Sequence, residues 1–322
     1  MISMQLLTPA IEKAYIDKLL ADDIRVSGQA DTYYQDALKD ILAHLNYYLR
    51  RFGIDGVLKY VALLKHNDWQ DNDEIERADR SARLASSSDQ QVKQREKLLA
   101  TQAKISRFQA LNALIGWSIA GASLSTIALL KQTLTNDFET AVSRQFNASQ
   151  LALKSGAETM LTSGLTKHKI LRQSKQIVST TVTGEDWSNN IWIYNDNLVN
   201  NVQNLVTKSL RSGLKQADLN KLFPNIKQPS GGSVTEQFEL NNTYIKRIIV
   251  TERARVLDQA TMAVFKAKGI KYFDWVTQAG ACGVCVDIES GNPYLVDDPD
   301  SPSIPDNSHP NCRCTKIAHI GK

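Results

Sequence analysis

The chain has 322 residues, of which 42% are hydrophobic and 22% charged, with a formal net charge of +4. This composition excludes a wholly disordered chain, and a pI near 8.7 lies below the values above about 9 that mark a dedicated nucleic-acid-binding domain. The length fits two domains or one elongated body. The first twenty residues show no basic segment followed by an apolar core, so we expect no secretory signal and a reducing cytoplasm.

The first two thirds of the chain read as helical. Thr8 and Pro9 match the residues that precede and open a helix, and the helical stretch over residues 33–52 is followed by Gly53, a common helix terminator. Residues 66–91 are rich in charge and poor in large apolar side chains. We predict a hinge between helical regions there.

The segment 108–130 carries no charge and is long enough to cross a bilayer. It also contains several polar side chains, and basic residues flank it on both sides, which gives no orientation signal. A helix buried in a bundle, or packed against a partner subunit, is the favoured interpretation. We therefore do not expect a membrane among the partners.

A short basic cluster follows, centred on His168. Such a cluster could contact the phosphates of DNA, but a solvated helix face is the more common role. We favour the solvated face and keep the DNA contact as the alternative. The cluster consists of Lys167, Lys169, Arg172 and Lys175.

Helical spacing of apolar residues predicts a helix over residues 186–212, with Gly213 at its end. A shorter helix should follow and stop before Pro224, and the Pro, Gly and Ser residues of 227–233 form the best candidate linker. We therefore divide the chain into a helical region (1–183), a helix pair (184–227) and a C-terminal module (228–322).

Ser233 and Glu236 have the spacing of a capping box, which predicts a helix that continues to Lys268. The aromatic and β-branched residues of 270–277 predict a strand. The expected fold is mainly α with a small α+β C-terminal module: an elongated helical body plus a metal-clipped, proline-rich C-terminal loop.

The proline-rich loop spans residues 291–310 and holds five of the eight prolines together with several aspartates. Such a segment buries too little surface to offset its ordering entropy, about 1–2 kcal/mol per residue. All four cysteines and one histidine flank it in the pattern C-x2-C-x23-H-x2-C-x-C. The candidate metal ligands are Cys282, Cys285, His309, Cys312 and Cys314.

Zinc fits this pattern, because a C-x2-C pair reaches one ion from a tight turn and a second pair closes a tetrahedron. Five candidates exist for four positions, so the ligands are either four cysteines or three cysteines with the histidine. Disulfides or redox-active thiols remain alternatives. A catalytic metal, with Asp287 or Glu289 as the general base, is a further alternative.

The C-terminal residues resemble a known family. TERARVLDQA (251–260), a strand with Trp275, the C-x2-C pair, Gly291 and the ending HPNCRC (309–314) are similar to the phage Mu protein F-like head morphogenesis proteins, also called minor head or minor capsid proteins. The similarity covers residues 187–314, including the helix pair with Trp187, Ile191 and Gly213. Asp258 departs from the family, which often has Asn there, and residues 278–280 lack its usual Asp.

This resemblance implies a structural, non-enzymatic protein of the virion, at the portal vertex or head interior, and in the host cytoplasm during procapsid assembly. The implied partners are the portal protein, the scaffold or major capsid protein and phage DNA, with a role in DNA packaging or ejection in some members and no small-molecule substrate. Thr251, Glu252 and Trp275 would support the zinc loop, the alternative being that Glu252 is a catalytic acid or base.

Two other functions stay open: a metal-dependent nuclease or toxin-type enzyme, and a zinc-ribbon nucleic-acid-binding protein. The sequence has no Gly-rich phosphate loop, HExxH motif or nucleophile elbow, which disfavours the enzyme. A nucleic-acid-binding surface beside the cysteines would be basic. The loop carries aspartates instead, which disfavours the zinc-ribbon nucleic-acid-binding protein. These aspartates are Asp297, Asp298, Asp300 and Asp306.

Overall fold

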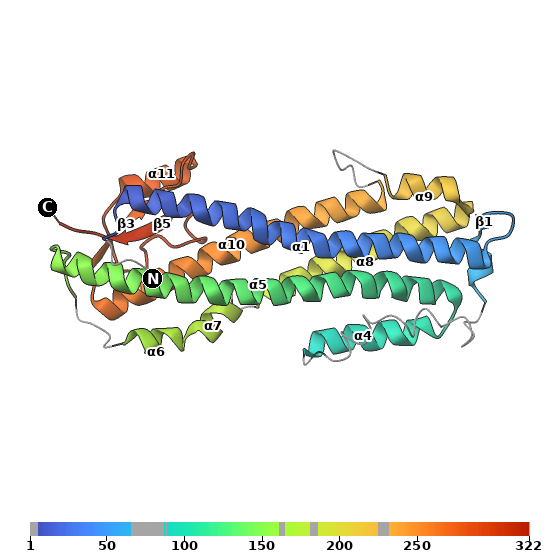
Figure 1. Ribbon diagram of the computed structural model, residues 1–322, viewed down its shortest axis with the longest axis horizontal. Coiled ribbons are helices and arrows are strands. Elements are labelled where there is room, and N and C mark those ends of the chain that lie inside the picture. Colours follow the sequence, from blue (N-terminus) through green and yellow to red (C-terminus); the bar gives the residue numbers. More distant parts are fainter. Residues whose placement is uncertain are drawn as a thin grey trace. The chain divides into compact units, whose positions relative to one another are not determined.

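Helices dominate the computed structural model, and short strands gather near the C-terminus (Figure 1). This confirms a mainly α fold with a small α+β C-terminal module. The structure describes residues 6–65, 87, 89–160, 165–180, 186–224 and 232–321. Most of the predicted hinge (66–91) and of the predicted linker (227–233) lies outside these residues.

The chain divides into two compact units, each assembled from segments far apart in sequence. Unit 1 comprises Met1–Ser27, Leu129–Trp187 and Lys246–Lys322, and unit 2 comprises Gly28–Ala128 and Ser188–Ile245. Three long helices contribute residues to both units: α1 (Pro9–Phe52), α5 (Arg107–Lys154) and α10 (Val234–Lys268). The division into 1–183, 184–227 and 228–322 runs along the sequence, and it stays a prediction.

The helix boundaries expected from capping residues are confirmed. The Thr8 hydroxyl oxygen accepts a hydrogen bond from the Ile11 N–H at 3.4 Å at the start of α1. At the start of α10, the Glu236 carboxylate accepts from the Ser233 N–H at 2.8 Å, and the Ser233 hydroxyl accepts from the Glu236 N–H at 3.2 Å. These reciprocal bonds satisfy backbone donors that a helix leaves open at its N-terminus.

Unit 2 is a helical bundle with one short antiparallel strand pair at its end. Within the bundle, Ser123 of α5 contacts Tyr34 of α1 and Asn195 of α8, and Tyr34 also packs on Phe238 of α10. The two strands pair with Val57 opposite Lys215. The expected helices 186–212 and before Pro224 are confirmed as α8 and α9. The further elements of this unit are β1 (Val57–Leu58), η1 (Tyr60–Leu63), α4 (Gln90–Ala103), α8 (Trp187–Ser212), β2 (Leu214–Lys215) and α9 (Gln216–Leu222).

The uncharged segment 108–130 lies in α5. Within the part of the chain that the structure describes, α5 is the one helix long and apolar enough to cross a membrane, and 67% of its apolar 18-residue window is buried inside the protein. Its polar side chains find partners there: the Ser123 hydroxyl lies 3.1 Å from the Tyr34 hydroxyl and donates to Asn195 Oδ1 at 3.0 Å. Such buried bonds are what a helix packed within a bundle requires.

Unit 1 carries a three-stranded antiparallel sheet in the order β4-β3-β5. The strand expected over 270–277 is confirmed as the central strand β3, with Phe273 opposite Tyr294 and Trp275 opposite Lys316. The buried Phe273 packs with Phe265 in a core of this unit. The elements that this unit adds are α6 (Lys167–Leu171), α7 (Ser174–Ser179), β3 (Tyr272–Val276), α11 (Gly283–Ser290), β4 (Tyr294–Leu295) and β5 (Thr315–Ala318).

Candidate metal centre

The first half of the cysteine cluster lies at the start of α11. Cys282 is the residue that precedes the helix, and Cys285 lies in its first turn, so the C-x2-C spacing puts both thiols at one end of a short helix. Cys282 is exposed and Cys285 is buried. The pKa of Cys282 is lowered, chiefly because its sulfur accepts a hydrogen bond from the Cys285 N–H.

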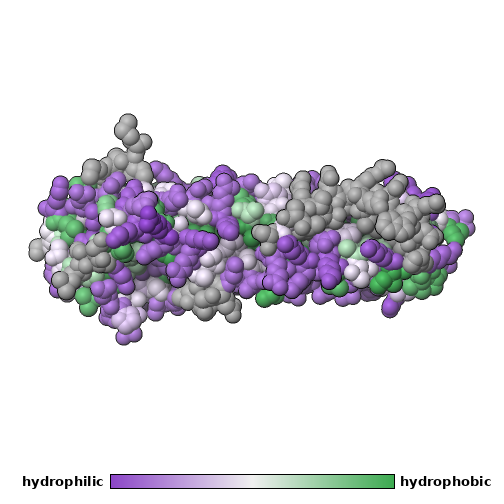
Figure 2. Space-filling view, turned by 90° about the horizontal axis from the view of Figure 1, so that it is seen from below, coloured by the Kyte–Doolittle hydropathy of each residue, from purple (hydrophilic) through white to green (hydrophobic). Residues whose placement is uncertain are grey.

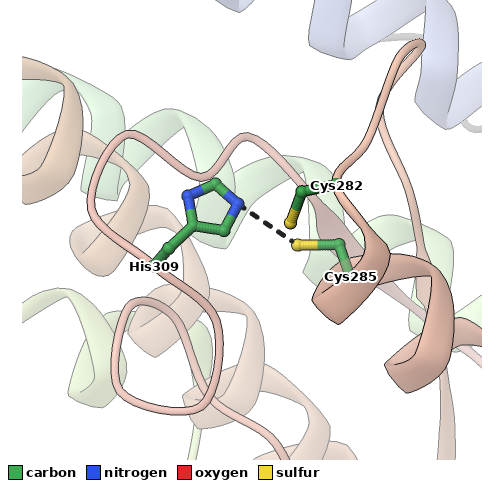
Figure 3. Close-up of side chains that lie close together, drawn as sticks. All are labelled: Cys282, Cys285 and His309. Carbon is green, nitrogen blue, oxygen red and sulfur yellow. Dashed lines mark hydrogen bonds between the residues drawn. The ribbon is translucent and has the colours of Figure 1, made fainter.

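The chain returns to this helix end after the proline-rich loop. His309 Nε2 lies 3.4 Å from the Cys285 sulfur, and the Cys312 sulfur lies 3.7 Å from it. Figure 3 shows Cys282 and Cys285 side by side, with the imidazole of His309 directed at the Cys285 sulfur. The two ends of the loop therefore meet at Cys285.

The ligand atoms form two overlapping groups, and within each group they lie within 4.8 Å of one another. Cys285 belongs to both groups. The first is Cys282, Cys285 and His309, and the second is Cys285, Cys312 and Cys314. A set of thiols and an imidazole at this spacing could hold a metal ion.

The cysteines are free thiols. The 3.7 Å between the Cys285 and Cys312 sulfurs is far longer than the S–S bond of a disulfide, about 2.05 Å. The structure thus keeps the thiols close together without joining them, as metal coordination requires.

The buried thiols differ in the direction in which their pKa is shifted. Burial raises the pKa of Cys285 to about 12. A hydrogen bond from the Cys314 thiol lowers the pKa of Cys312 to about 5, and the same bond raises the pKa of Cys314. The pKa of His309 is raised, first because its ring N–H donates to the Pro310 carbonyl. A bound cation would compete with these protons, since it favours the deprotonated ligands.

One residue that α10 directs at the end of the loop is Thr251. Its hydroxyl oxygen accepts a hydrogen bond from the Asn311 N–H at 3.1 Å, next to Cys312 and at a residue with φ of 66°. Glu252, which we expected to contact the loop, instead accepts from Arg255 Nε on the same helix at 2.6 Å. Burial raises the pKa of the Glu252 carboxyl. The adjacent Arg255 guanidinium acts in the opposite direction, but its effect is smaller than that of burial.

Trp275 packs against the buried cysteines of the cluster. Its side chain is fully buried and packs with Cys285, Cys312 and Cys314 in one core. Asn292 holds the Trp275 backbone from both sides: its carbonyl accepts from the Trp275 N–H at 2.7 Å, and its amide donates to the Trp275 carbonyl at 2.9 Å. The strand β3 and the start of the proline-rich loop are thereby fixed to each other.

The two carboxylates considered as general bases differ in their surroundings. Glu289 accepts hydrogen bonds from the Thr277 N–H at 3.1 Å and from its hydroxyl at 2.7 Å, so its oxygens are engaged in holding the strand end. Asp287 is exposed on α11. Neither arrangement directs a carboxylate at the sulfur cluster.

Asp258 and Lys316 form a buried ion pair that no local sequence pattern indicates. Their charged groups lie 2.8 Å apart, and both side chains are almost fully buried. Asp258 also accepts a hydrogen bond from the Ile304 N–H at 3.3 Å. The middle of the proline-rich loop is therefore attached to α10, in addition to the attachment of its end through Thr251.

A second buried network links the last cysteines to α1 and α5. Arg253 Nη1 donates to Asp23 Oδ1 at 2.6 Å and Arg253 Nε donates to Asp137 Oδ2 at 2.7 Å, while Arg313, between Cys312 and Cys314, also pairs with Asp23. This network was not predicted from the sequence. A signal existed, since Glu12 and Asp23 fall on the buried stripe of α1 among apolar residues.

The basic cluster lies elsewhere in unit 1, on α6, α7 and the turn between them. Lys169, Arg172 and Lys175 are exposed, and Lys167 is half-buried. This is the placement of a solvated helix face, and a DNA contact there stays a prediction.

Comparisons with protein-family models, with curated proteins and with solved structures found no match for this chain.

Proposed function

We propose that this chain is a structural minor head protein of a tailed bacteriophage that acts in procapsid assembly at the portal vertex, with a zinc ion clipping its C-terminal loop. The proposal starts from the resemblance of residues 187–314 to the phage Mu protein F-like proteins. The observation that carries it is the meeting of the C-x2-C pair with the HPNCRC segment at Cys285. The HPNCRC ending is the most specific part of the resemblance, and the C-x2-C pair is another part of it.

Zinc is the metal that the donor set favours. Zn–S bonds of about 2.3 Å and Zn–N bonds of about 2.0–2.1 Å, in a tetrahedron, place two sulfurs about 3.8 Å apart and a sulfur and a nitrogen about 3.6 Å apart. The distances from Cys285 to Cys312 and to His309 are 3.7 Å and 3.4 Å. Thiolate and imidazole ligands also select zinc over calcium or magnesium, which prefer oxygen.

A structural role for the metal fits the cluster better than a catalytic one. Five side chains compete for four positions, so a tetrahedral ion would be closed by protein ligands and keep no position for water. Glu289 is engaged by Thr277. The ion would hold the loop in place, and the residues of the loop would supply a defined surface.

The supporting contacts suit a protein whose surface must be fixed before it meets a partner. Thr251, Asp258 and Asn292 each attach a different part of the proline-rich loop to α10 or β3. A loop ordered in advance loses less entropy when it binds, which favours assembly at low protein concentration. Such a surface is useful to a protein present in few copies.

The test is co-expression of the chain with the portal protein of the same phage, followed by sedimentation. We expect the two proteins to run together at the size of a portal ring, and the Cys285→Ser/Cys312→Ser variant to do so less well. A chain that runs alone at every salt concentration would contradict the proposal. Cleavage of plasmid DNA with added Mg²⁺ would then support the nuclease alternative, and salt-dependent DNA binding the nucleic-acid-binding one.

A further inference from the structure

One end of unit 2 exposes four large aliphatic side chains. Ile54 is 73% exposed, Val61 67%, Leu64 52% and Ile105 59%. Three of them lie in the segment 54–64, which contains η1, and Ile105 lies in the turn after α4. The N–H of Arg107 joins the two segments by donating to the carbonyl of Lys65 at 3.2 Å, next to Ile105 and Leu64. Figure 2 shows hydrophobic surface at the end of unit 2 that carries β1 in Figure 1.

The same end is strongly basic. Residues 46–65, 101–112 and 205–224 carry ten lysines and arginines and two aspartates. Contacts hold these stretches side by side: β1 pairs with β2, Arg211 lies over the Tyr60 ring at 5.5 Å, and the Tyr60 and Phe108 rings are 4.8 Å apart. We call this surface, with the four aliphatic side chains, the basic end.

Several of these cations are available to a partner. Lys59, Lys65 and Lys104 form no ion pair with another residue that the structure describes. Exposed aliphatic side chains among unpaired charges are typical of an interaction surface. The partner should present carboxylates around apolar side chains.

Unit 1 presents a surface of that chemistry. Residues 281–310 contain six acidic residues and no lysine or arginine. Asp287, Asp298 and Asp300 are exposed, and aliphatic side chains are exposed beside them in the same module. These are Val284 (51%), Val286 (49%) and Leu295 (40%). We call this surface the acidic face.

We propose that the basic end of one copy of this chain docks on the acidic face of a second copy. Opposite charges and exposed aliphatic side chains on both surfaces make them complementary. Two basic ends would repel each other, so a symmetric pair joined through them is disfavoured. A head-to-tail contact leaves one basic end and one acidic face unused, and therefore builds a closed ring or an open filament.

This inference does not depend on the portal, so it can be tested on the purified chain alone. The test is sedimentation velocity in about 50 mM and about 500 mM salt, since the screening length of exposed charges falls from about 14 Å to about 4 Å across this range of ionic strength. We expect wild-type chain at up to roughly 100 μM to form species larger than a dimer at low salt, and their dissociation at high salt.

Two variants separate the two surfaces. One removes the basic end (Ile54→Ser, Lys59→Gln and Lys104→Gln), and the other neutralises the acidic face (Asp287→Asn, Asp298→Asn and Asp300→Asn). Each should weaken self-association at least about tenfold. An equal mixture of the two should form a heterodimer and stop there, because only one intact surface of each kind remains. A control variant changes exposed residues of α1: Asp17→Asn, Lys18→Gln and Ile24→Ser.

The control variant should associate as the wild type does, and all variants should keep the wild-type circular dichroism. Wild-type chain that stays monomeric at low salt would overturn the proposal. So would self-association that both surface variants retain, or a mixture of the two variants that forms no heterodimer. If the chain self-associates as expected but does not bind the portal protein, only the proposed function is contradicted.

Discussion

Arg253 and Asp23 form a fully buried pair, with Nη1 of the arginine 2.6 Å from Oδ1 of the aspartate. Asp23 also pairs with Arg313, the residue between Cys312 and Cys314. One carboxylate of α1 therefore contacts two buried arginines: Arg253 on α10, which also pairs with Asp22 and Asp137, and Arg313 inside the cysteine cluster.

Replacing Asp23 with alanine should be strongly destabilising, because it removes the carboxylate that pairs with the buried Arg313, while Arg253 keeps Asp22 and Asp137. We expect a loss of about 3–5 kcal/mol in the free energy of unfolding, measured by urea denaturation. Asp36→Ala is the matched control, since Asp36 pairs with Lys39 on the exposed face of α1. The control should change stability by less than about 1 kcal/mol, and equal losses in both variants would contradict the assignment.

The Asp258–Lys316 pair can be tested by a double-mutant cycle. Asp258→Asn or Lys316→Met alone leaves one buried charge unpaired and should cost about 3–5 kcal/mol. The double variant should lose less than the sum of the two, with a coupling of about 1–3 kcal/mol. Additive losses would mean that the two groups do not interact. Asp258→Asn should also increase protease cleavage near Ile304, whose N–H it holds.

The metal clip predicts local disorder when a ligand is lost. Cys282→Ser or Cys312→Ser should make residues 282–314 sensitive to protease while leaving helical circular dichroism nearly unchanged, because the helices of both units do not depend on the loop for their own hydrogen bonds. Chelation of the wild type should have the same effect, and added zinc should reverse it in the wild type only. Unaltered protease resistance of the variants would count against the clip.

The two overlapping groups of ligands give a prediction about the ligand set. Cys285 is in both groups, so Cys285→Ser should abolish stoichiometric metal binding. At most one of Cys282→Ser and Cys314→Ser should leave stoichiometric binding intact, because a tetrahedral ion takes four of the five candidates. Cobalt substitution, read by the intensity of the absorption bands, measures the number of thiolate ligands in each variant. Stoichiometric binding that survives Cys285→Ser would overturn this geometry.

His44 should make the stability of the chain depend on pH. Burial lowers the pKa of His44 from 6.5 to about 4, so the folded state keeps this imidazole neutral while the unfolded state binds a proton. Its contribution is present above about pH 6.5 and is lost as the pH falls toward 4, with about 2 kcal/mol lost at pH 5. His44→Gln should flatten this part of the stability profile. An unchanged profile in His44→Gln would contradict the prediction.

Local signals in the sequence were enough to predict most elements. The capping box of Ser233 and Glu236, the apolar spacing of α8 and the β-branched run of β3 each depend on residues close together in the chain. The ligand candidates could be found for the same reason, since their pattern flanks one loop. What joins distant segments was missed: Asp23 and Arg313 are 290 positions apart, and no local pattern indicates which buried charge meets which.

The expected role of Glu252 shows that even a contact made by a neighbouring residue on one helix is not predictable from local sequence. Glu252 lies on α10, but the direction of its side chain depends on Arg255, three residues further along. Thr251, one residue earlier on the helix, makes the contact with the loop. A shift of one residue turns a helical side chain by about 100°, so the helix itself could be predicted but not the side chain that it directs at the loop.

The left-handed backbone of Asn311 has a consequence for recognising other proteins of this kind. With φ of 66°, the position favours asparagine or glycine and penalises β-branched residues. The arginine that follows the next cysteine needs a buried acid, which here comes from the first helix of the chain. We expect distant relatives to keep three features together: an Asn or Gly before the C-x-C pair, a basic residue within that pair, and an acid on the apolar stripe of an N-terminal helix. Such a three-part signature, spread across the chain, could identify relatives whose overall sequences share too little to align.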